Sequence, residues 1–297
     1  MKYRTDLALE SQEMLERARK KTAGAAGGYV SRKIQKDEDI TVTEIIIESP
    51  EGEKALGKPK GTYVTIESEA VLREKDGIKE RTSRALADEL TKMIPFSYSL
   101  KVLVVGLGNE KVTPDSLGPH TVDKVRITAH LFKMFDADGD WEMANVSGFN
   151  PSVTGVTGME TADLIEKAVS LVKPDVTVII DSLAARDLKR LSTTIQICDT
   201  GIEPGAGMGN RRKAISRETL GCKVVAIGVP TVIDSRTLIA EASEIIASWD
   251  EEATERYIES RDLDMIVTST DIDRIIKDFS DIISNAINIT LHPGIYS

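Results

Sequence analysis

The sequence predicts an α/β sandwich of three layers, with a mostly parallel central sheet and a β extension on its N-terminal side. Three segments, Lys101–Gly108, Val176–Leu183 and Lys223–Val229, are continuous runs of Val, Ile and Leu. Such runs are typical of strands that are buried on both faces, as in a parallel sheet. Segments with helical spacing of apolar residues lie between or after them, and this alternation of strand and helix is typical of α/β proteins.

The remaining elements follow from similar patterns. A fourth strand of the sheet is expected at Thr193–Gly201, and the β extension consists of two strands rich in β-branched residues, at Ile40–Ser49 and Gly61–Ser68. Apolar residues at helical spacing predict helices over five further segments: Thr82–Met93, Leu117–Phe132, Glu160–Val172, Thr231–Ala247 and Asp271–Ile287.

Residues 1–38 differ in character from the rest of the chain. They are polar, carry both signs of charge, and contain the Gly-Ala stretch Thr22–Gly28, which breaks any long helix. We therefore expect residues 7–38 to form a loosely packed arm of a single domain that spans residues 7–297.

Composition excludes several classes of protein. The chain has 297 residues and a net charge of −10, from 38 Lys and Arg against 48 Asp and Glu, and only 4% of its residues are aromatic. A general nucleic-acid binder needs a basic face or a platform of aromatic rings, so no direct nucleic-acid partner is expected. No uncharged apolar stretch approaches the roughly 18 residues that span a bilayer, and the charged N-terminus does not resemble a signal peptide. We expect a protein of the cytoplasm with no membrane partner.

Two acids stand where the predicted sheet offers a binding site. Asp181 ends the apolar strand Val176–Ile180, and Asp115 lies in the loop that follows Lys101–Gly108 and precedes a helix. Ligands of open α/β sheets bind beyond the carboxyl ends of the strands. Burial and mutual repulsion raise the pKa of such a pair, which can then act as general acid and general base. The alternative is structural: Asp115 caps the helix and Asp181 accepts hydrogen bonds from a loop.

Within the segment Asp199–Gly221, the glycines Gly205, Gly207 and Gly209 precede the cations Arg211, Arg212 and Lys213. It does not match a phosphate-binding loop. The loop could bind a carboxylate-rich substrate, or it could be an ordinary solvated basic loop. Other nucleophilic sites find little support, because the chain has no G-x-S-x-G motif and only three histidines, none in a recognisable catalytic or metal-binding pattern.

Several long motifs resemble the germination protease (spore protease) family of endospore-forming bacteria. They include VVGLGNEKVTPDSLGPHTVDKV, IIDSLAARD, TIQICDTGIEPGAGMGNRRKAISRETLG and VVAIGVPTVIDSRT, in the order of the family, with MIVTSTDID following near the C-terminus. The resemblance implies an α/β fold related to that of hydrogenase maturation endopeptidases. It also implies a tetrameric endopeptidase of the spore core that degrades small acid-soluble spore proteins. The two essential aspartates of the family fall on Asp115 and Asp181.

The resemblance also implies a zymogen that removes its own N-terminus at a site like the substrate motif Thr/Ser-Glu-Phe/Ile/Tyr-Ala-Ser/Gly-Glu. The segment Thr5–Glu10, TDLALE, has the same order of residue types except at Leu9. We therefore expect cleavage between Asp6 and Leu7, with residues 1–6 as the propeptide. Acidic positions beside this bond need positive counter-charge, and Arg211, Arg212 and Lys213 are the candidates.

Two other functions are open at this point. One is a metal-dependent endopeptidase of the maturation type, although no histidine stands in an obvious position for a third metal ligand, so we assign no metal-binding residue and no cofactor. The other is a non-catalytic protein that binds acidic protein partners through the glycine-rich loop.

Overall fold

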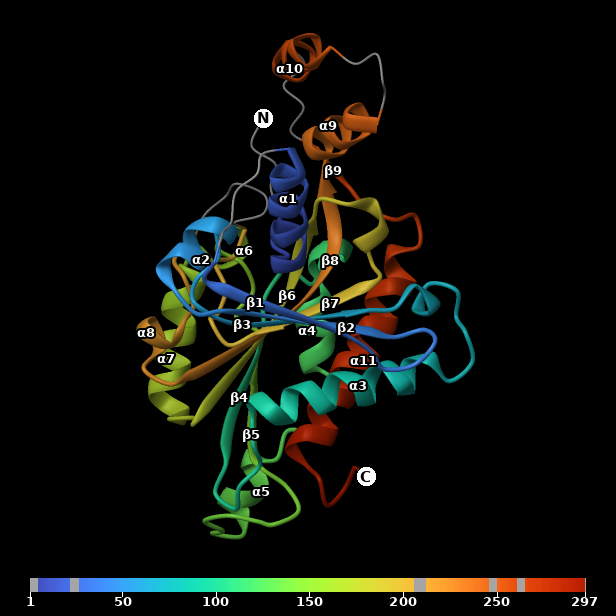
Figure 1. Ribbon diagram of the computed structural model, residues 1–297. Coiled ribbons are helices and arrows are strands. Elements are labelled where there is room, and N and C mark those ends of the chain that lie inside the picture. Colours follow the sequence, from blue (N-terminus) through green and yellow to red (C-terminus); the bar gives the residue numbers. More distant parts are fainter. Residues whose placement is uncertain (1–4, 22–26, 206–211, 246–249, 261–264, 297) are drawn as a thin grey trace.

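The computed structural model describes residues 5–21, 27–205, 212–245, 250–260 and 265–296. Within these residues the centre of the molecule is a nine-stranded sheet of order β1-β2-β3-β7-β8-β6-β4-β5, with β9 paired to the end of β8. Helices cover both faces of the sheet, which gives three layers (Figure 1). The predicted α/β sandwich with an N-terminal β extension is confirmed.

The strands of the sheet are β1 (Tyr29–Gln35), β2 (Thr41–Ile47), β3 (Gly61–Glu67), β4 (Lys101–Gly106), β5 (Asn145–Phe149), β6 (Val176–Ala185), β7 (Thr194–Cys198), β8 (Lys223–Asp234) and β9 (Ile266–Val267). The α-helices are α1 (Ala8–Lys21), α2 (Pro50–Leu56), α3 (Ile78–Met93), α4 (Leu117–Val122), α5 (Ala129–Met134), α6 (Thr154–Thr157), α7 (Thr161–Val172), α8 (Arg217–Leu220), α9 (Ser235–Ile245), α10 (Glu251–Ser260) and α11 (Ile272–Leu291). Short 3₁₀ turns are η1 (Glu69–Val71), η2 (Thr113–Asp115) and η3 (Leu188–Arg190).

The sheet has a parallel half and an antiparallel half, so it is mixed and not mostly parallel. Strands β5, β4, β6 and β8 run parallel, as the apolar runs predict for β4, β6 and β8; β5 was not predicted. Strand β7 is antiparallel to β8, and β3, β2 and β1 continue from it in antiparallel order. The connection from β6 to β7 holds only the turn η3, which is too short for the crossover that a parallel strand needs.

The apolar core lies on both faces of this sheet. In β4, Val102 and Val104 point toward one cluster, which α3, α4 and α11 complete, whereas Leu103 and Val105 point toward a second cluster with α1, α2 and α7. This alternation is the period of two that a strand imposes on its side chains. The candidate site described below lies on the side of the second cluster.

The N-terminal segment is packed, and the prediction of a loose arm is wrong. Leu7 and Ala8 are fully buried at the start of α1, and β1 pairs with β2 along its whole length. The pattern of β1 did not predict a strand because it is an edge strand with mostly exposed side chains.

The helix expected over Leu117–Phe132 consists of two short helices, α4 and α5. The backbone N–H of Thr128 donates to the carbonyl of Val146, and this bond holds the chain away from a continuous helix. Among the described residues, no helix combines the length and apolar character that crossing a bilayer requires.

Candidate active site

Two polar side chains flank a glycine in the middle of the sheet. Gly228 of β8 lies opposite Asp181 on β6 and opposite Gln196 on β7. Residues in register on neighbouring strands point to the same face, so Asp181 and Gln196 lie on one face, on either side of Gly228. A Cβ atom at Gly228 would come within 2.5 Å of the Leu183 side chain. Because Gly228 has no side chain, it leaves room for the side chain of Leu183 from β6.

Asp181 is a buried carboxyl with few partners. It is 7% exposed and accepts a hydrogen bond from the backbone N–H of Ser182, at 2.9 Å. In the part of the chain that the structure describes, no cation forms an ion pair with it. Burial raises the pKa of Asp181 well above its ordinary value, and the nearby charges of Asp115 and Asp6 raise it further. Asp181 therefore retains its proton more strongly than an ordinary carboxyl.

Asp115 reaches the same edge of the sheet from the loop after β4. The ends of β4 and β6 are joined by a hydrogen bond from Leu107 N to Ile180 O, at 2.8 Å. Gly108 adopts a φ of 110°, and a Cβ atom there would lie 1.9 Å from the backbone oxygen of Asp115. Only glycine permits this close approach, which brings the turn η2 against the strand ends.

The environment of Asp115 differs from that of a helix cap. Its carboxylate accepts a hydrogen bond from the backbone N–H of Asn109, at 2.9 Å, and α4 has Ser116 as its N-cap residue, without any side-chain cap. The capping alternative is therefore wrong for Asp115. Burial raises the pKa of Asp115 to about 6, against the lowering effect of the Asn109 N–H. Two carboxyls with raised pKa values thus interact at one edge of the sheet, as the strand-end argument predicts.

The N-terminal segment lies in this site. The backbone N–H of Asp6 donates to Ala184 O at 3.1 Å, and Ala184 N donates to the Asp6 carboxylate at 2.9 Å. The Gln196 amide contacts the backbone on both sides of Leu7: its Nε2 donates to Asp6 O at 3.1 Å, and its Oε1 accepts from Ala8 N at 2.7 Å. Lys58 Nζ donates to Asp6 O at 2.9 Å. The chain around the Asp6–Leu7 bond is therefore held from several directions.

Glu10 anchors the segment four residues further on. Its carboxylate is 2% exposed and accepts hydrogen bonds from the backbone N–H groups of Arg186 and Asp187, at 2.8 and 2.9 Å. It also accepts a bond from the Thr5 hydroxyl, and the Arg190 guanidinium lies 4.0 Å away. Burial raises the pKa of Glu10, and these donors act in the opposite direction. The last acid of the TDLALE segment thus occupies a fitted polar site.

A cavity of about 1000 Å³ adjoins these residues. Its lining includes Asp6, Asp181 and Gln196, together with Lys58 and Gly205 at its borders. A volume of this size accommodates several peptide residues, since sites for small ligands are typically about 300–1,000 Å³.

The glycine-rich loop borders the cavity, but its described cations face elsewhere. Lys213 pairs with Asp163 and Glu166 of α7, at 2.8 and 3.3 Å, and Arg212 lies 4.0 Å from Glu160. Arg211 lies outside the described residues. The role of these three cations as counter-charge stays a prediction.

Among the described residues no histidine or cysteine hydrogen-bonds to Asp115 or Asp181, although Cys198 lines the cavity. His292 is buried, with Nε2 3.0 Å from Arg126 O, and burial lowers its pKa. Cys198 and Cys222 are free thiols that contact Gly201 O and the Thr177 hydroxyl. Among the residues described, no three His, Cys, Asp or Glu side chains are grouped as ligands for a metal ion.

Sequence reasoning missed Lys58, Ala184 and Gln196. Gln196 carries a readable signal, because it is the one amide in the buried strand TIQIC. Lys58 follows a short helix and has no neighbours in sequence that single it out. Ala184 acts through its backbone, which no residue type identifies.

Comparison with known proteins identifies the family to which the chain belongs. Residues 8–264 match the model of a family described as germination protease. A germination protease of Caldanaerobacter subterraneus is 40% identical, over 98% of this chain and 95% of the relative. One of Clostridium tetani is 38% identical over 99% and 97%. One of Bacillus mycoides is 40% identical over 82% of this chain and 66% of the relative.

A solved structure gives a weaker similarity. The [NiFe] hydrogenase maturation protease HycI of Thermococcus kodakarensis aligns with 65% of this chain and 98% of its own, at 13% identity and a TM-score of 0.30. A similarity at this level carries no argument about the fold or the chemistry of this chain.

Proposed function

The chain belongs to the germination protease family and is an endopeptidase of spore germination, and on this basis we propose that it is made as a zymogen that removes its own residues 1–6. The mature enzyme then degrades small acid-soluble spore proteins in the spore core. Hydrolysis is assisted by Asp115 and Asp181. The single observation that carries this proposal is the docking of Thr5–Glu10 beside Asp181, with the residues on both sides of the Asp6–Leu7 bond hydrogen-bonded to the enzyme.

The proposed chemistry uses one proton shared by two carboxyls. Asp115 is less buried than Asp181, so we assign the ionised carboxylate to Asp115, which takes a proton from the attacking water. Asp181 stays protonated and supplies a proton as the peptide bond breaks. The two groups interact and titrate as a pair, so a single ionisation of the pair produces the active form.

The docked segment supports the proposed substrate class. Each contact that it makes has a counterpart in the motif Thr-Glu-Ile-Ala-Ser-Glu: the first acid meets Ala184 N, and the last acid meets the N–H groups of Arg186 and Asp187. Small acid-soluble spore proteins with this motif would bind in the same register. Leu9, where the motif has Ser or Gly, is the one departure.

For Arg211, Arg212 and Lys213 we propose contacts with acidic residues of the substrate beyond the six-residue motif. The borders of their loop, Gly205 and Ala214, line the same cavity as Asp181. Replacing Arg212 and Lys213 by Gln should therefore raise KM for a full-length protein substrate and leave KM for the six-residue peptide unchanged.

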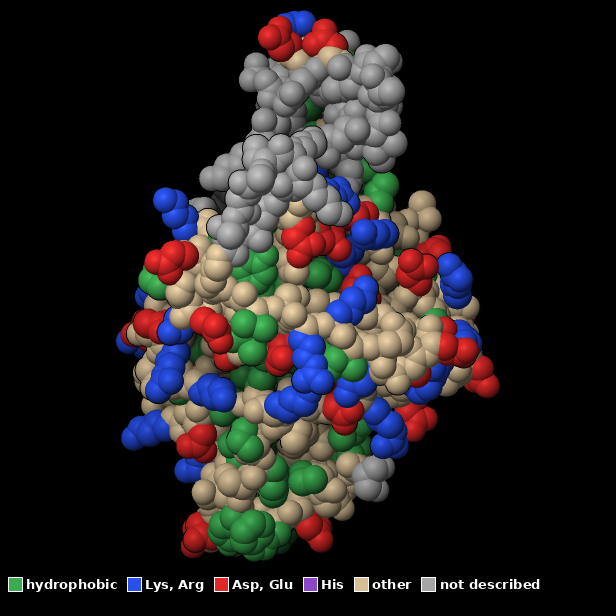
Figure 2. Space-filling view, in the orientation of Figure 1, with side chains coloured by type: hydrophobic (Ala, Val, Ile, Leu, Met, Phe, Trp, Pro, Cys, Tyr) green, Lys and Arg blue, Asp and Glu red, His purple; other side chains and the backbone are tan. Residues whose placement is uncertain are grey.

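The proposal includes assembly as a homotetramer, as the family resemblance implies. Support comes from apolar side chains at and just beyond α5, where Met134, Phe135 and Trp141 are between 69% and 75% exposed. Hydrophobic side chains gather at this end of the molecule, at the bottom of Figure 2. Sedimentation of the wild-type chain and of a Phe135→Ser, Trp141→Ser variant tests whether this surface is an interface.

The activity is tested with the peptide Thr-Glu-Ile-Ala-Ser-Glu and a chain that begins at Leu7. Products are read by mass spectrometry for the parent, Asp115→Asn and Asp181→Asn, with Asp88→Asn on the exposed face of α3 as the matched control. Cleavage after Glu that both site variants lose, and that the control retains, supports the proposal. Loss of cleavage with a chelator would instead assign the two acids to a metal-dependent reaction, and binding without cleavage would indicate a non-catalytic protein.

A further inference from the structure

We propose that Lys58 and Gln196 form an oxyanion site, which stabilises the negative charge that develops on the scissile carbonyl oxygen. The inference rests on the proposed function, because it takes Asp6–Leu7 as the scissile bond. It extends that function from the two acids to the groups that stabilise the transition state.

Two donors converge on one carbonyl oxygen. The oxygen of Asp6 accepts from Lys58 Nζ at 2.9 Å and from Gln196 Nε2 at 3.1 Å. They come from different elements, the segment after α2 and the strand β7. Preorganised donors within about 2.7–3.1 Å of a developing oxyanion are the geometry that acyl-transfer enzymes use.

Lys58 has the chemistry for this role. Its ammonium group donates to Asp6 O and, at 3.4 Å, to Thr5 O. Among the described residues it forms no ion pair with a carboxylate. The two charged groups that raise the pKa of Asp181, beyond the effect of burial, are the acids Asp115 and Asp6. A cation that is not neutralised by the protein, in a partly buried site, stabilises an oxyanion more than it stabilises a neutral carbonyl.

Gln196 is held in the orientation that the role requires. It is 7% exposed, and its Oε1 accepts from Ala8 N at 2.7 Å. Because one end of the amide is fixed by this bond, the other end presents its N–H to Asp6 O. Its place opposite Gly228, in the same row as Asp181, keeps the donor and the acid on the same face of the sheet.

The reaction then balances with water as the only co-reactant. The water oxygen attacks the carbonyl carbon of Asp6 and gives one proton to the Asp115 carboxylate. The carbonyl electron pair moves to the oxygen, where Lys58 and Gln196 donate hydrogen bonds to it. Collapse of this intermediate breaks the bond to Leu7 N, which receives a proton from Asp181.

A purely structural role makes a different prediction. If Lys58 only anchors the segment, its loss weakens docking and raises KM. If it stabilises the transition state, its loss lowers kcat while the segment stays bound. Removing one oxyanion donor typically costs about 100–1,000-fold in kcat.

The test therefore separates kcat from docking. Lys58→Met, Lys58→Arg and Gln196→Leu are made in the full chain and in the chain that begins at Leu7. Lys54→Met is the matched control, because Lys54 lines the same cavity without contacting Asp6 in the described contacts. Peptide cleavage gives kcat and KM, hydrogen exchange of Leu7–Glu10 in the full chain reports docking, and thermal unfolding reports folding.

We expect Lys58→Met to lower kcat roughly 100-fold with KM within about threefold. We also expect unchanged exchange at Leu7–Glu10 and partial rescue by Arg. Gln196→Leu should lower kcat to a similar extent and should also speed exchange at Ala8. A folded Lys58→Met variant with the kcat of the parent, or one that changes only KM and exchange, overturns the inference. If the parent does not cleave the peptide, the proposed function fails before the variants are compared.

Discussion

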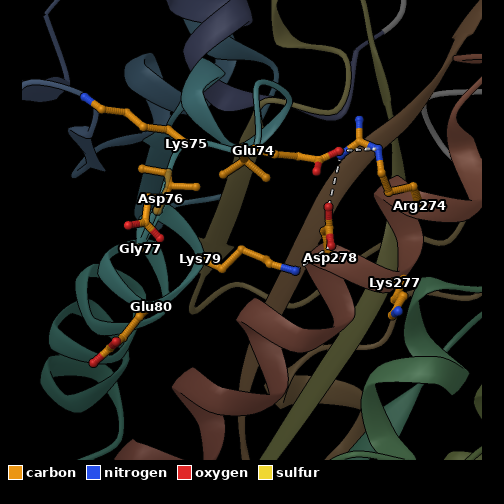
Figure 3. A pocket seen from close by; sticks show the side chains of 11 residues that line it. Glu74, Lys75, Asp76, Gly77, Lys79, Glu80, Arg274, Lys277 and Asp278 are labelled. Atoms are coloured by element: carbon orange, nitrogen blue, oxygen red, sulfur yellow. Dashed lines mark hydrogen bonds and ion pairs between the residues drawn. The ribbon is translucent and has the colours of Figure 1, made fainter.

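Two aspartates, Asp181 and Asp278, are buried to nearly the same degree and have opposite surroundings. Asp278 of α11 is 5% exposed and accepts from Lys79 Nζ at 2.8 Å and from Arg274 Nη1 at 3.1 Å. Figure 3 shows these two cations pointing at Asp278 from α3 and α11, with Glu74 paired to Arg274. Asp181 is 7% exposed and receives a single backbone N–H.

The difference separates a structural acid from a reactive one. Around Asp278 two cations pair with the carboxylate, and the bond to Asp278 raises the pKa of Lys79. Around Asp181 no such cation is found among the described residues, and burial, together with the nearby carboxyls of Asp115 and Asp6, raises its pKa. Burying a charged group without a partner costs free energy. This cost is present at Asp181, whereas at Asp278 the two cations offset it. Perturbed acids of this kind mark functional sites.

The largest expected effect comes from replacing Asp181 and Asp278, one at a time, by asparagine. Asp181→Asn should abolish cleavage, by at least about 1,000-fold, and leave the free energy of unfolding unchanged or higher, because it removes a buried carboxyl without a partner. Asp278→Asn should leave kcat within twofold and lower the free energy of unfolding by about 1 kcal/mol, since its cations are partly exposed. Peptide cleavage and urea unfolding measure the two quantities. Equal effects of both variants on cleavage would contradict the comparison.

The pH dependence should be the next largest effect. Asp115 is the proposed base and its pKa is raised to about 6, so this base is protonated below that pH and kcat/KM should rise as pH increases through about 6. Asp115→Asn should remove this limb together with the activity. A rate that is flat between pH 5 and 7 would show that the pair does not control cleavage.

The free energy of unfolding should fall as pH rises, whereas kcat/KM should rise. The pKa of Asp115 is about 6 in the folded chain and about 3.8 in an unfolded one, so the folded state binds the extra proton between these values. Its contribution to stability is therefore present below pH 4 and is lost as pH rises to 6, by about 1–3 kcal/mol. Replacing Asp115 by Asn should raise stability relative to the parent more at pH 7 than at pH 4, as measured by urea unfolding.

A smaller effect is expected where the docked segment ends. Glu10→Gln should slow removal of residues 1–6 about tenfold, because hydrogen bonds from Arg186 N and Asp187 N to a carboxylate are stronger than those to a neutral amide. Glu16→Gln, on the exposed side of α1, is the control. Equal processing rates of these two variants, measured by intact mass over time, would exclude the Glu10 site from recognition.

The smallest effect should come from one cation of the paired cluster. Lys79→Met should lower the free energy of unfolding by about 0.5 kcal/mol, since Lys79 is half exposed and Arg274 still pairs with Asp278. Cleavage should not change. A loss of activity in a folded Lys79→Met variant would show that the α3–α11 pocket also takes part in function.

The parts of the fold that could be predicted are those in which burial dictates residue type. The strands β4, β6 and β8 appear as apolar runs because both of their faces are covered, and Asp181 stands out because it ends such a run. The direction of β7 depends on the short β6–β7 connection, and β1 is too exposed to carry a pattern.

The candidate site could be predicted only in part, because some of its groups belong to the backbone and not to recognisable side chains. Asp115 and Asp181 are recognisable from the ends of their strands, and Thr5–Glu10 from its likeness to the substrate motif. The contacts that join them are made by backbone groups of Ala184, Arg186 and Asp187, and by Lys58 from a distant segment. Backbone donors leave no trace in residue types, so the contacts that hold the N-terminal segment in the site could not be foreseen.

The most direct test of the account is the N-terminus of the chain after maturation. The full-length parent, Asp181→Asn and Asp278→Asn are incubated side by side, and their N-termini are read by mass spectrometry. The account predicts that the parent and Asp278→Asn begin at Leu7, and that Asp181→Asn keeps its first six residues. Processing of Asp181→Asn at the same rate, or a mature N-terminus at another residue in the parent, would contradict it.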